Sequence, residues 1–123
     1  LVAPIMRANN WGRIINVSSN LAQDARGGQA SYAAAKAGLH GLTRNLAREL
    51  GPYGILTNVV MPGLTLTERP NRPLSEHIMT ELSEMACTGR LTESHEVASL
   101  IVFLGSGANG HINGELIRVD GGL

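Results

Sequence analysis

Cysteine, aromatic side chains and long apolar runs are scarce in this chain of 123 residues. Its one cysteine, Cys87, makes an internal disulfide impossible and argues against a cysteine-ligated zinc site. Aromatic residues form 3% of the chain, too few for the stacking platforms that bind single-stranded nucleic acid. The longest strongly apolar run, residues 100–104, falls well short of the ~20 residues that span a bilayer.

An excess of charge of one sign is also missing. Ten basic residues balance ten acidic ones, so electrostatics give no reason to expect nucleic acid or an anionic membrane as a partner. No signal-peptide pattern opens the chain and one cysteine fits a reducing compartment, so a cytoplasmic location is expected. Apolar residues make up 43% of the chain, which suffices for the packed core of one domain.

The apolar pattern alternates between short strands and amphipathic helices. Each expected strand is an apolar run bounded by glycine or proline, and each expected helix repeats apolar residues at steps of three and four. This order is typical of an α/β fold with a mostly parallel sheet. The strands are expected at 13–17, 55–61 and 114–119, the helices at 31–50, 74–86 and 94–104, and a loop at 18–28.

The longest expected helix carries a continuous leucine stripe. Leu39, Leu42, Leu46 and Leu50 recur at helical spacing, so they are expected on its buried face. Ser31 is expected to cap the N-terminus of this helix, because a serine oxygen there accepts a hydrogen bond from an unpaired backbone amide.

A tyrosine and a lysine stand four residues apart near the start of that helix. Tyr32 and Lys36 therefore lie on one helix face, where a phenol and an ammonium are held side by side. A free tyrosine, with a pKa of about 10, is a poor proton donor at neutral pH, and a nearby positive charge stabilises the phenolate. Ser19, thirteen residues earlier, could hold the oxygen of a carbonyl or alcohol. By itself the pattern also arises by chance, as a partly exposed tyrosine and a solvated lysine.

The expected topology brings these residues to one edge of the sheet. Ligands of open parallel sheets bind beyond the carboxyl ends of the strands. Ser19 lies just after the first expected strand and Gly63 just after the second. Tyr32 lies in the first turn of the helix that leaves the same edge. The three features therefore converge on one rim, which a chance pattern would have no reason to do.

Four motifs also occur in a fixed order along the chain. They are Asn-Val-Ser-Ser at 16–19, Tyr-Ala-Ala-Ala-Lys-Ala-Gly at 32–38, Asn-Val-Val-Met-Pro-Gly at 58–63 and Gly-Glu-Leu-Ile-Arg-Val-Asp-Gly-Gly at 114–122. Together they resemble the C-terminal half of a short-chain dehydrogenase/reductase over essentially all residues. Within that family the chain is most similar to the branch that includes 3-oxoacyl-[acyl-carrier-protein] reductases.

The resemblance implies a Ser-Tyr-Lys catalytic site. Tyr32 would exchange a proton with the substrate oxygen, Lys36 would tune the tyrosine and bind the nicotinamide ribose, and Ser19 would orient and polarise that oxygen. Ser18 is the alternative to Ser19, and the thirteen-residue spacing to the tyrosine favours Ser19. The implied cofactor is NADP or NAD, with NADP favoured. Cofactor contacts are implied for Tyr32, Lys36, Pro62, Gly63, Thr65 and Thr67.

The resemblance also implies a partial Rossmann-like fold, a doubly wound parallel sheet of three C-terminal strands with helices. Residues 1–123 would be the C-terminal catalytic half of a single Rossmann-fold domain, with the N-terminal dinucleotide-binding half missing. The implied substrate is a small carbonyl or alcohol, a 3-oxoacyl thioester being one candidate, and the complete protein would form a homodimer or homotetramer. Within the expected helix over 74–86, Ile78 and Met79 would either shape the substrate pocket or pack in the core.

Two other functions stay open. A truncated, catalytically silent fragment could act as an assembly partner, because its first strand would present a bare sheet edge. Half of a split enzyme would be active only when mixed with a separate N-terminal half. The four histidines show no ligand spacing and are expected to be solvated or capping, so no metal is expected.

Overall fold

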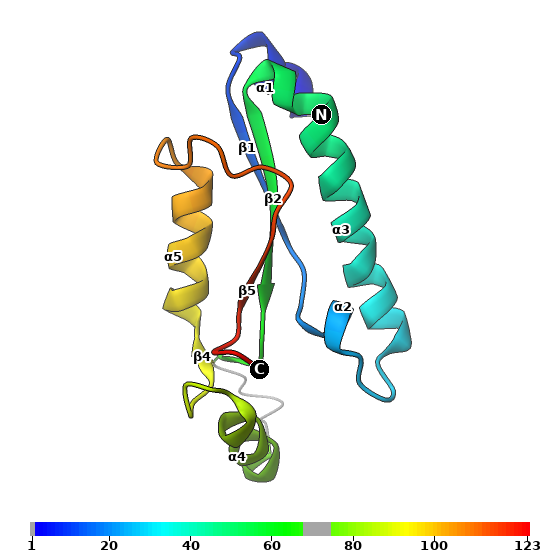
Figure 1. The fold of residues 1–123 in the computed structure, drawn as a ribbon, viewed down its shortest axis with the longest axis vertical. Coiled ribbons are helices and arrows are strands. Elements are labelled where there is room, and N and C mark those ends of the chain that lie inside the picture. The colour runs from blue at the N-terminus through cyan, green and yellow to red at the C-terminus, as the bar shows by residue number, and fades with distance from the viewer. Residues whose placement is uncertain (1, 68–74) are drawn as a thin grey trace.

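A three-stranded parallel sheet lies at the centre of the chain (Figure 1). The structure is a computed structural model that describes residues 2–67 and 75–123. The parallel sheet flanked by helices confirms the predicted α/β, partial Rossmann-like fold. The sheet order is β1-β2-β5, with strands β1 (Gly12–Val17), β2 (Ile55–Pro62) and β5 (Leu116–Val119).

The central strand β2 contributes much of the core. Ile55, Val59 and Val60 are fully buried. A parallel strand that is covered on both faces takes a near-continuous apolar run, which is why this strand could be recognised from the sequence. In the register, Val60 pairs with Val17 of β1 on one side and with Ile117 of β5 on the other.

Two long helices cover the sheet from opposite sides (Figure 1). α3 (Ala30–Leu50) lies on one side, and α5 (Ser94–Gly105) lies on the other and contacts β1 and β2. A short helix, α1 (Ala3–Ala8), leads into β1, and a 3-10 turn, η1 (Gly51–Tyr53), joins α3 to β2. Each long helix therefore follows or precedes a strand of the same sheet, as in a doubly wound fold.

The buried face of α3 differs from the leucine stripe that the spacing predicts. Leu42 is 48% exposed, and Leu39 and Leu46 are only half-buried. Polar groups of β1 select a different face, because Asn16 Nδ2 donates a hydrogen bond to Thr43 Oγ1 at 2.8 Å. The buried residues of α3 are His40, Thr43, Ala47 and Leu50.

The two long helices begin in different ways. α3 has Gln29 at its N-cap position and no side-chain cap, so the predicted capping role of Ser31 is wrong. α5 begins with a capping box, in which the Glu93 side chain accepts a hydrogen bond from the backbone amide of Glu96, and the Glu96 side chain accepts one from the backbone amide of Glu93. Of these two helices, α5 therefore has the side-chain support for its first turn.

Several short elements gather at the carboxyl edge of the sheet. A helix of four residues, α2, interrupts the segment that the sequence predicts to be a loop. β3 and β4 form a two-stranded parallel ladder. α4 matches the expected helix over 74–86, whose first residue lies outside the described residues. These elements are α2 (Leu21–Asp24), β3 (Thr65–Leu66), α4 (Glu76–Met85) and β4 (Thr92–Glu93).

Candidate active site

A cleft of about 650 Å³ opens at the carboxyl edge of the sheet, where the sequence predicts ligand binding. Ser19 reaches it from the segment after β1, and Tyr32 from the first turn of α3. Gly63 and Thr65 reach it from the chain beyond β2. The fold therefore brings four of the predicted site residues, distant in sequence, around one space.

Helix α4 supplies an apolar part of the cleft wall. Leu82 and Met85 line the cleft beside Glu81. Ile78 and Met79 are not among the described lining residues, so the pocket-shaping role considered for them is not what the structure shows. Leu82 lies four residues, about one helical turn, after Ile78 on the same face of α4. The residues of α4 that line the cleft are therefore closer to its C-terminal end than expected.

Tyr32 and Lys36 lie side by side on α3. The Nζ atom of Lys36 is 5.8 Å from the centroid of the Tyr32 ring, within the range of a cation–π contact. The same ammonium donates a hydrogen bond to the backbone oxygen of Val17 at 2.9 Å. This bond fixes the lysine at the end of β1 and leaves two of its three N–H donors for a ligand. Tyr32 is 42% exposed, so a ligand in the cleft can reach its phenol.

The two adjacent serines have different surroundings. Ser18 Oγ donates to the backbone oxygen of Lys36 at 3.0 Å and lies 2.9 Å from Nε2 of His40. A hydroxyl has one proton, so the histidine must be the donor in the second bond. Ser19 Oγ accepts a hydrogen bond from the Leu21 amide at 3.3 Å. Its own O–H can therefore donate to a substrate in the cleft, whereas the Ser18 hydroxyl is engaged on both sides.

His40 is a supporting residue that the sequence expectation missed. It is 8% exposed, so the expected solvated or capping role is wrong for this histidine. Burial lowers the pKa of its imidazole and the charge of Arg44 lowers it further, which favours the neutral ring. The signal was present in the sequence, because Tyr32, Lys36 and His40 are spaced by four and so share one helix face.

The remaining predicted cofactor residues follow one another at the end of β2. Pro62 ends the strand, and its carbonyl accepts a hydrogen bond from the segment after β1. Gly63 packs so closely that a Cβ there would lie 2.6 Å from the Cβ of Asp120. Thr65 Oγ1 donates to the Gly63 carbonyl at 3.1 Å. Pro62 and Thr67 are not among the described residues that line the cleft.

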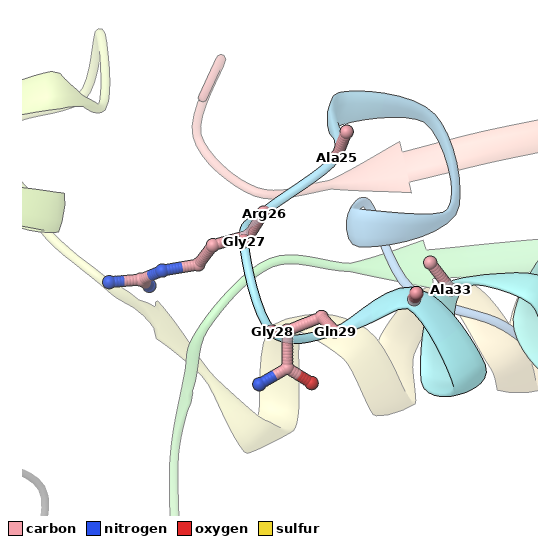
Figure 2. Close-up of a pocket in the computed structure, with 7 residues that line it drawn as sticks. Ala25, Arg26, Gly27, Gly28, Gln29 and Ala33 are labelled. Atoms are coloured by element: carbon pink, nitrogen blue, oxygen red, sulfur yellow. The ribbon is translucent and has the colours of Figure 1, made fainter.

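The loop between α2 and α3 separates the cleft from a second hollow. Figure 2 shows this hollow, of about 390 Å³, with Arg26 and Gln29 extending from the loop in different directions. Ala25, Arg26 and Gln29 line both spaces, so the loop is a thin wall between them. Gly28 has a φ of 77°, a conformation that glycine adopts without steric cost.

Residues 2–67 and 75–123 contain neither a metal-binding cluster nor a membrane-spanning helix. No three histidine, cysteine or acidic side chains there gather closely enough to hold a metal ion. In the same residues, no helix has the length and apolar character needed to cross a membrane.

Comparison with known proteins identifies the family. Residues 1–123 match the family described as enoyl-(acyl carrier protein) reductase. The 3-oxoacyl-[acyl-carrier-protein] reductase FabG of Aquifex aeolicus (strain VF5) is 41% identical over 118 residues, 96% of this chain and 47% of that protein. FabG of Escherichia coli (strain K12) is 41% identical over 122 residues, 97% of this chain and 50% of that protein. The chain belongs to the short-chain dehydrogenase/reductase family, as its motifs predict.

A solved structure shares the fold. The gluconate 5-dehydrogenase from Burkholderia cenocepacia J2315, in complex with NADP and tartrate, matches with a TM-score of 0.91 and 35% identity over 99% of this chain and 48% of that one. The chain spans about half the length of the curated relatives it matches. These relatives are named as reductases and dehydrogenases, so the prediction that the chain resembles an enzyme of this family is confirmed.

Proposed function

We propose that this chain carries the proton-transfer site of an NAD(P)(H)-dependent oxidoreductase that interconverts a carbonyl and an alcohol. One observation carries the proposal: Ser19 and Tyr32 line one cleft, and the Lys36 ammonium lies 5.8 Å from the centroid of the tyrosine ring. In this proposal residues 1–123 form the catalytic half of a single Rossmann-fold domain.

Proton transfer in the direction of reduction begins at Tyr32, which gives its phenolic proton to the carbonyl oxygen of the substrate. The phenolate that remains is stabilised by the positive charge of Lys36. Ser19 donates its O–H to the same substrate oxygen and holds it within reach of the phenol. In oxidation the phenolate takes the proton back. Ser18 does not serve in this role, because its hydroxyl already bonds α3 twice.

The donors at the cleft fit the nicotinamide end of a dinucleotide. Such a cofactor, when bound, supplies the hydride in reduction and accepts it in oxidation. Lys36 offers its two remaining N–H donors to ribose hydroxyls, while Pro62 at the end of β2, with Gly63, Thr65 and Thr67 after it, would hold the nicotinamide. NADP is favoured over NAD because the gluconate 5-dehydrogenase of similar fold was solved with NADP.

A 3-oxoacyl thioester is the substrate class that the relatives favour. The FabG relatives are named for 3-oxoacyl groups, and the (3R)-3-hydroxyacyl-CoA dehydrogenase of Homo sapiens is 40% identical over 112 residues, 91% of this chain and 42% of that protein. The apolar wall that Leu82 and Met85 form suits an acyl chain. We further propose a cytoplasmic homodimer or homotetramer as the working state.

Replacing Tyr32 by phenylalanine tests the proposal. Tyr32→Phe removes the acid, so reduction of acetoacetyl-CoA by NADPH should slow by about 10²–10⁴-fold while NADPH affinity stays nearly unchanged. Tyr53→Phe is the matched control, because Tyr53 lies in η1, where the centroid of its ring is 3.9 Å from Cζ of Arg7. Equal turnover by Tyr32→Phe and the unmodified protein would exclude the mechanism.

A second function has one structural observation in its favour. β1 lies at an edge of the sheet, with β2 on one side and no described strand on the other. A free strand edge can pair with another chain, as a silent assembly partner or half of a split enzyme would require. If the 123 residues are such a half, they should not bind NADPH with micromolar affinity by themselves. Calorimetric detection of micromolar binding would contradict this.

A further inference from the structure

Arg118 joins α2 to the final residues of the chain beside the cleft. From β5, its Nη1 donates to Oδ1 of Asp24 at 2.9 Å and its Nη2 donates to the other oxygen of the same carboxylate. Its Nε donates to Oδ2 of the buried Asp120 at 2.7 Å, and Nη2 also donates to the Leu123 carbonyl at 2.7 Å. The hydrogen bond to Asp24 raises the pKa of Arg118 above its ordinary value. The guanidinium is thus permanently charged and bonded along its whole edge.

Two of these partners are walls of the cleft. Asp24 and Leu123 both line it. Asp24 is the last residue of α2, the helix that begins two residues after Ser19. The chain then leaves through Ala25 at a φ of 48°, a left-handed conformation that is uncommon for a residue with a Cβ. Such a conformation persists where neighbouring contacts hold it, and the bond from Arg118 to Asp24 is the neighbouring contact.

We infer that Arg118 is a positioning residue for the reaction. By holding α2 through Asp24 and the final residues through Leu123, it sets the separation of the two cleft walls between which the substrate would lie. Arg118 itself is not among the described lining residues, so it acts through the residues it holds. The paired geometry fixes direction as well as distance, which a lysine cannot reproduce. The expected effect of Arg118 on KM rests on the proposed function, whereas its expected effect on the opening of α2 does not.

Hydrogen exchange tests the structural consequence. The amides of Ala22, Gln23 and Asp24 in α2 donate to the backbone oxygens of the two residues just before the helix, so they report on its opening. In the protein as its gene encodes it, Arg118→Met should speed exchange over residues 20–27 by about tenfold. Arg90→Met is the matched control, because Arg90 makes an equally paired bond to Glu96 at 2.6 and 2.9 Å in the first turn of α5. That variant should leave exchange over 20–27 unchanged.

Steady-state kinetics test the positioning role. With acetoacetyl-CoA and NADPH, Arg118→Met should raise KM for the thioester by about tenfold and leave KM for NADPH and kcat nearly unchanged. Arg118→Lys should recover part of that loss. Asp24→Asn should raise KM similarly, and the double variant should be no worse than the more affected single one, because both changes break the same bond.

The outcomes distinguish the structural role of Arg118, its role in the reaction and the proposed function. Unchanged exchange over 20–27 in Arg118→Met would overturn the inference. Faster exchange with an unchanged KM would show a structural tie without a positioning role, which also overturns it. If the unmodified protein turns over no carbonyl substrate at all, the proposed function fails, and the exchange result alone then decides whether Arg118 holds α2.

Discussion

Replacing each of the adjacent serines by alanine should lower mainly the stability of the fold in one variant and mainly the reaction rate in the other. Ser18 and Ser19 follow β1 directly, and both are buried. Ser18 joins the strand to α3 through Lys36 and His40. Ser19 lines the cleft. The two substitutions remove the same atom one position apart, so any difference between them comes from the surroundings.

The expected magnitudes follow from the lost hydrogen bonds. Ser18→Ala leaves the buried Nε2–H of His40 without its acceptor, which costs about 1–3 kcal/mol of the free energy of unfolding. In a domain of this size that corresponds to a fall in Tm of roughly 4–12 °C. Ser19→Ala removes only a 3.3 Å bond to the Leu21 amide, worth about 0.5–1 kcal/mol. Losing a donor to the substrate oxygen should instead lower kcat by about 10²–10³-fold.

Urea unfolding and initial rates, measured on the same preparations, check both numbers. The rate assay is reduction of acetoacetyl-CoA by NADPH. Ser99→Ala is the control, because its exposed hydroxyl donates to the backbone oxygen of His95 within α5, and the change should alter stability by less than about 0.5 kcal/mol. If Ser18→Ala abolished turnover while Ser19→Ala only destabilised the fold, the assignment of the two serines would be reversed and the mechanism above would be wrong.

Two more predictions concern the support of the site. Because burial lowers the folded-state pKa of His40 below its ordinary 6.5, the unfolded state takes up a proton first as pH falls. Stability should therefore hold above pH 6.5 and decline below it, and urea midpoints of His40→Asn should lack that decline. Gly54→Ala should cost about 3 kcal/mol or more, since its φ is 70° and a Cβ would lie 2.4 Å from the Asn10 carbonyl oxygen. Gly27→Ala, with nothing within 4 Å, should be nearly neutral in the same assay.

The fold was largely predictable because its central strand is buried on both faces. Such a strand reads as a near-continuous apolar run, which turn residues delimit. The four-residue helix α2 is too short to show any periodicity, so it was expected as loop. The orientation of α3 also escaped prediction. Leucine spacing favours Leu42 inside, but the hydrogen bond from Asn16 to Thr43 joins residues 27 positions apart, which no local pattern reveals.

The residues that the strand order brings together could be predicted from the sequence. Side-chain pairs between residues distant in sequence could not. Ser19 and Tyr32 meet because strand ends and helix starts share one edge of a parallel sheet. Arg118 and Asp24 are 94 positions apart and share no motif, so only the folded chain shows that they pair. Spacing by four from Lys36 would have placed His40 on the helix face that carries Tyr32 and Lys36.

The end of β1 is the reference point from which the site is positioned. Lys36 is bound there twice, since Ser18 Oγ donates to its backbone oxygen and its Nζ donates to the oxygen of Val17. Two bonds to one residue fix both the position and the direction of that turn of α3, and Tyr32 lies one turn away on the same face. Ser19, the next residue after this junction, is placed by the same strand. Changes at 17–19 should therefore disturb the distance between the serine and the tyrosine more than equally large changes elsewhere in β1, because Val17 and Ser18 make both hydrogen bonds to this turn of α3.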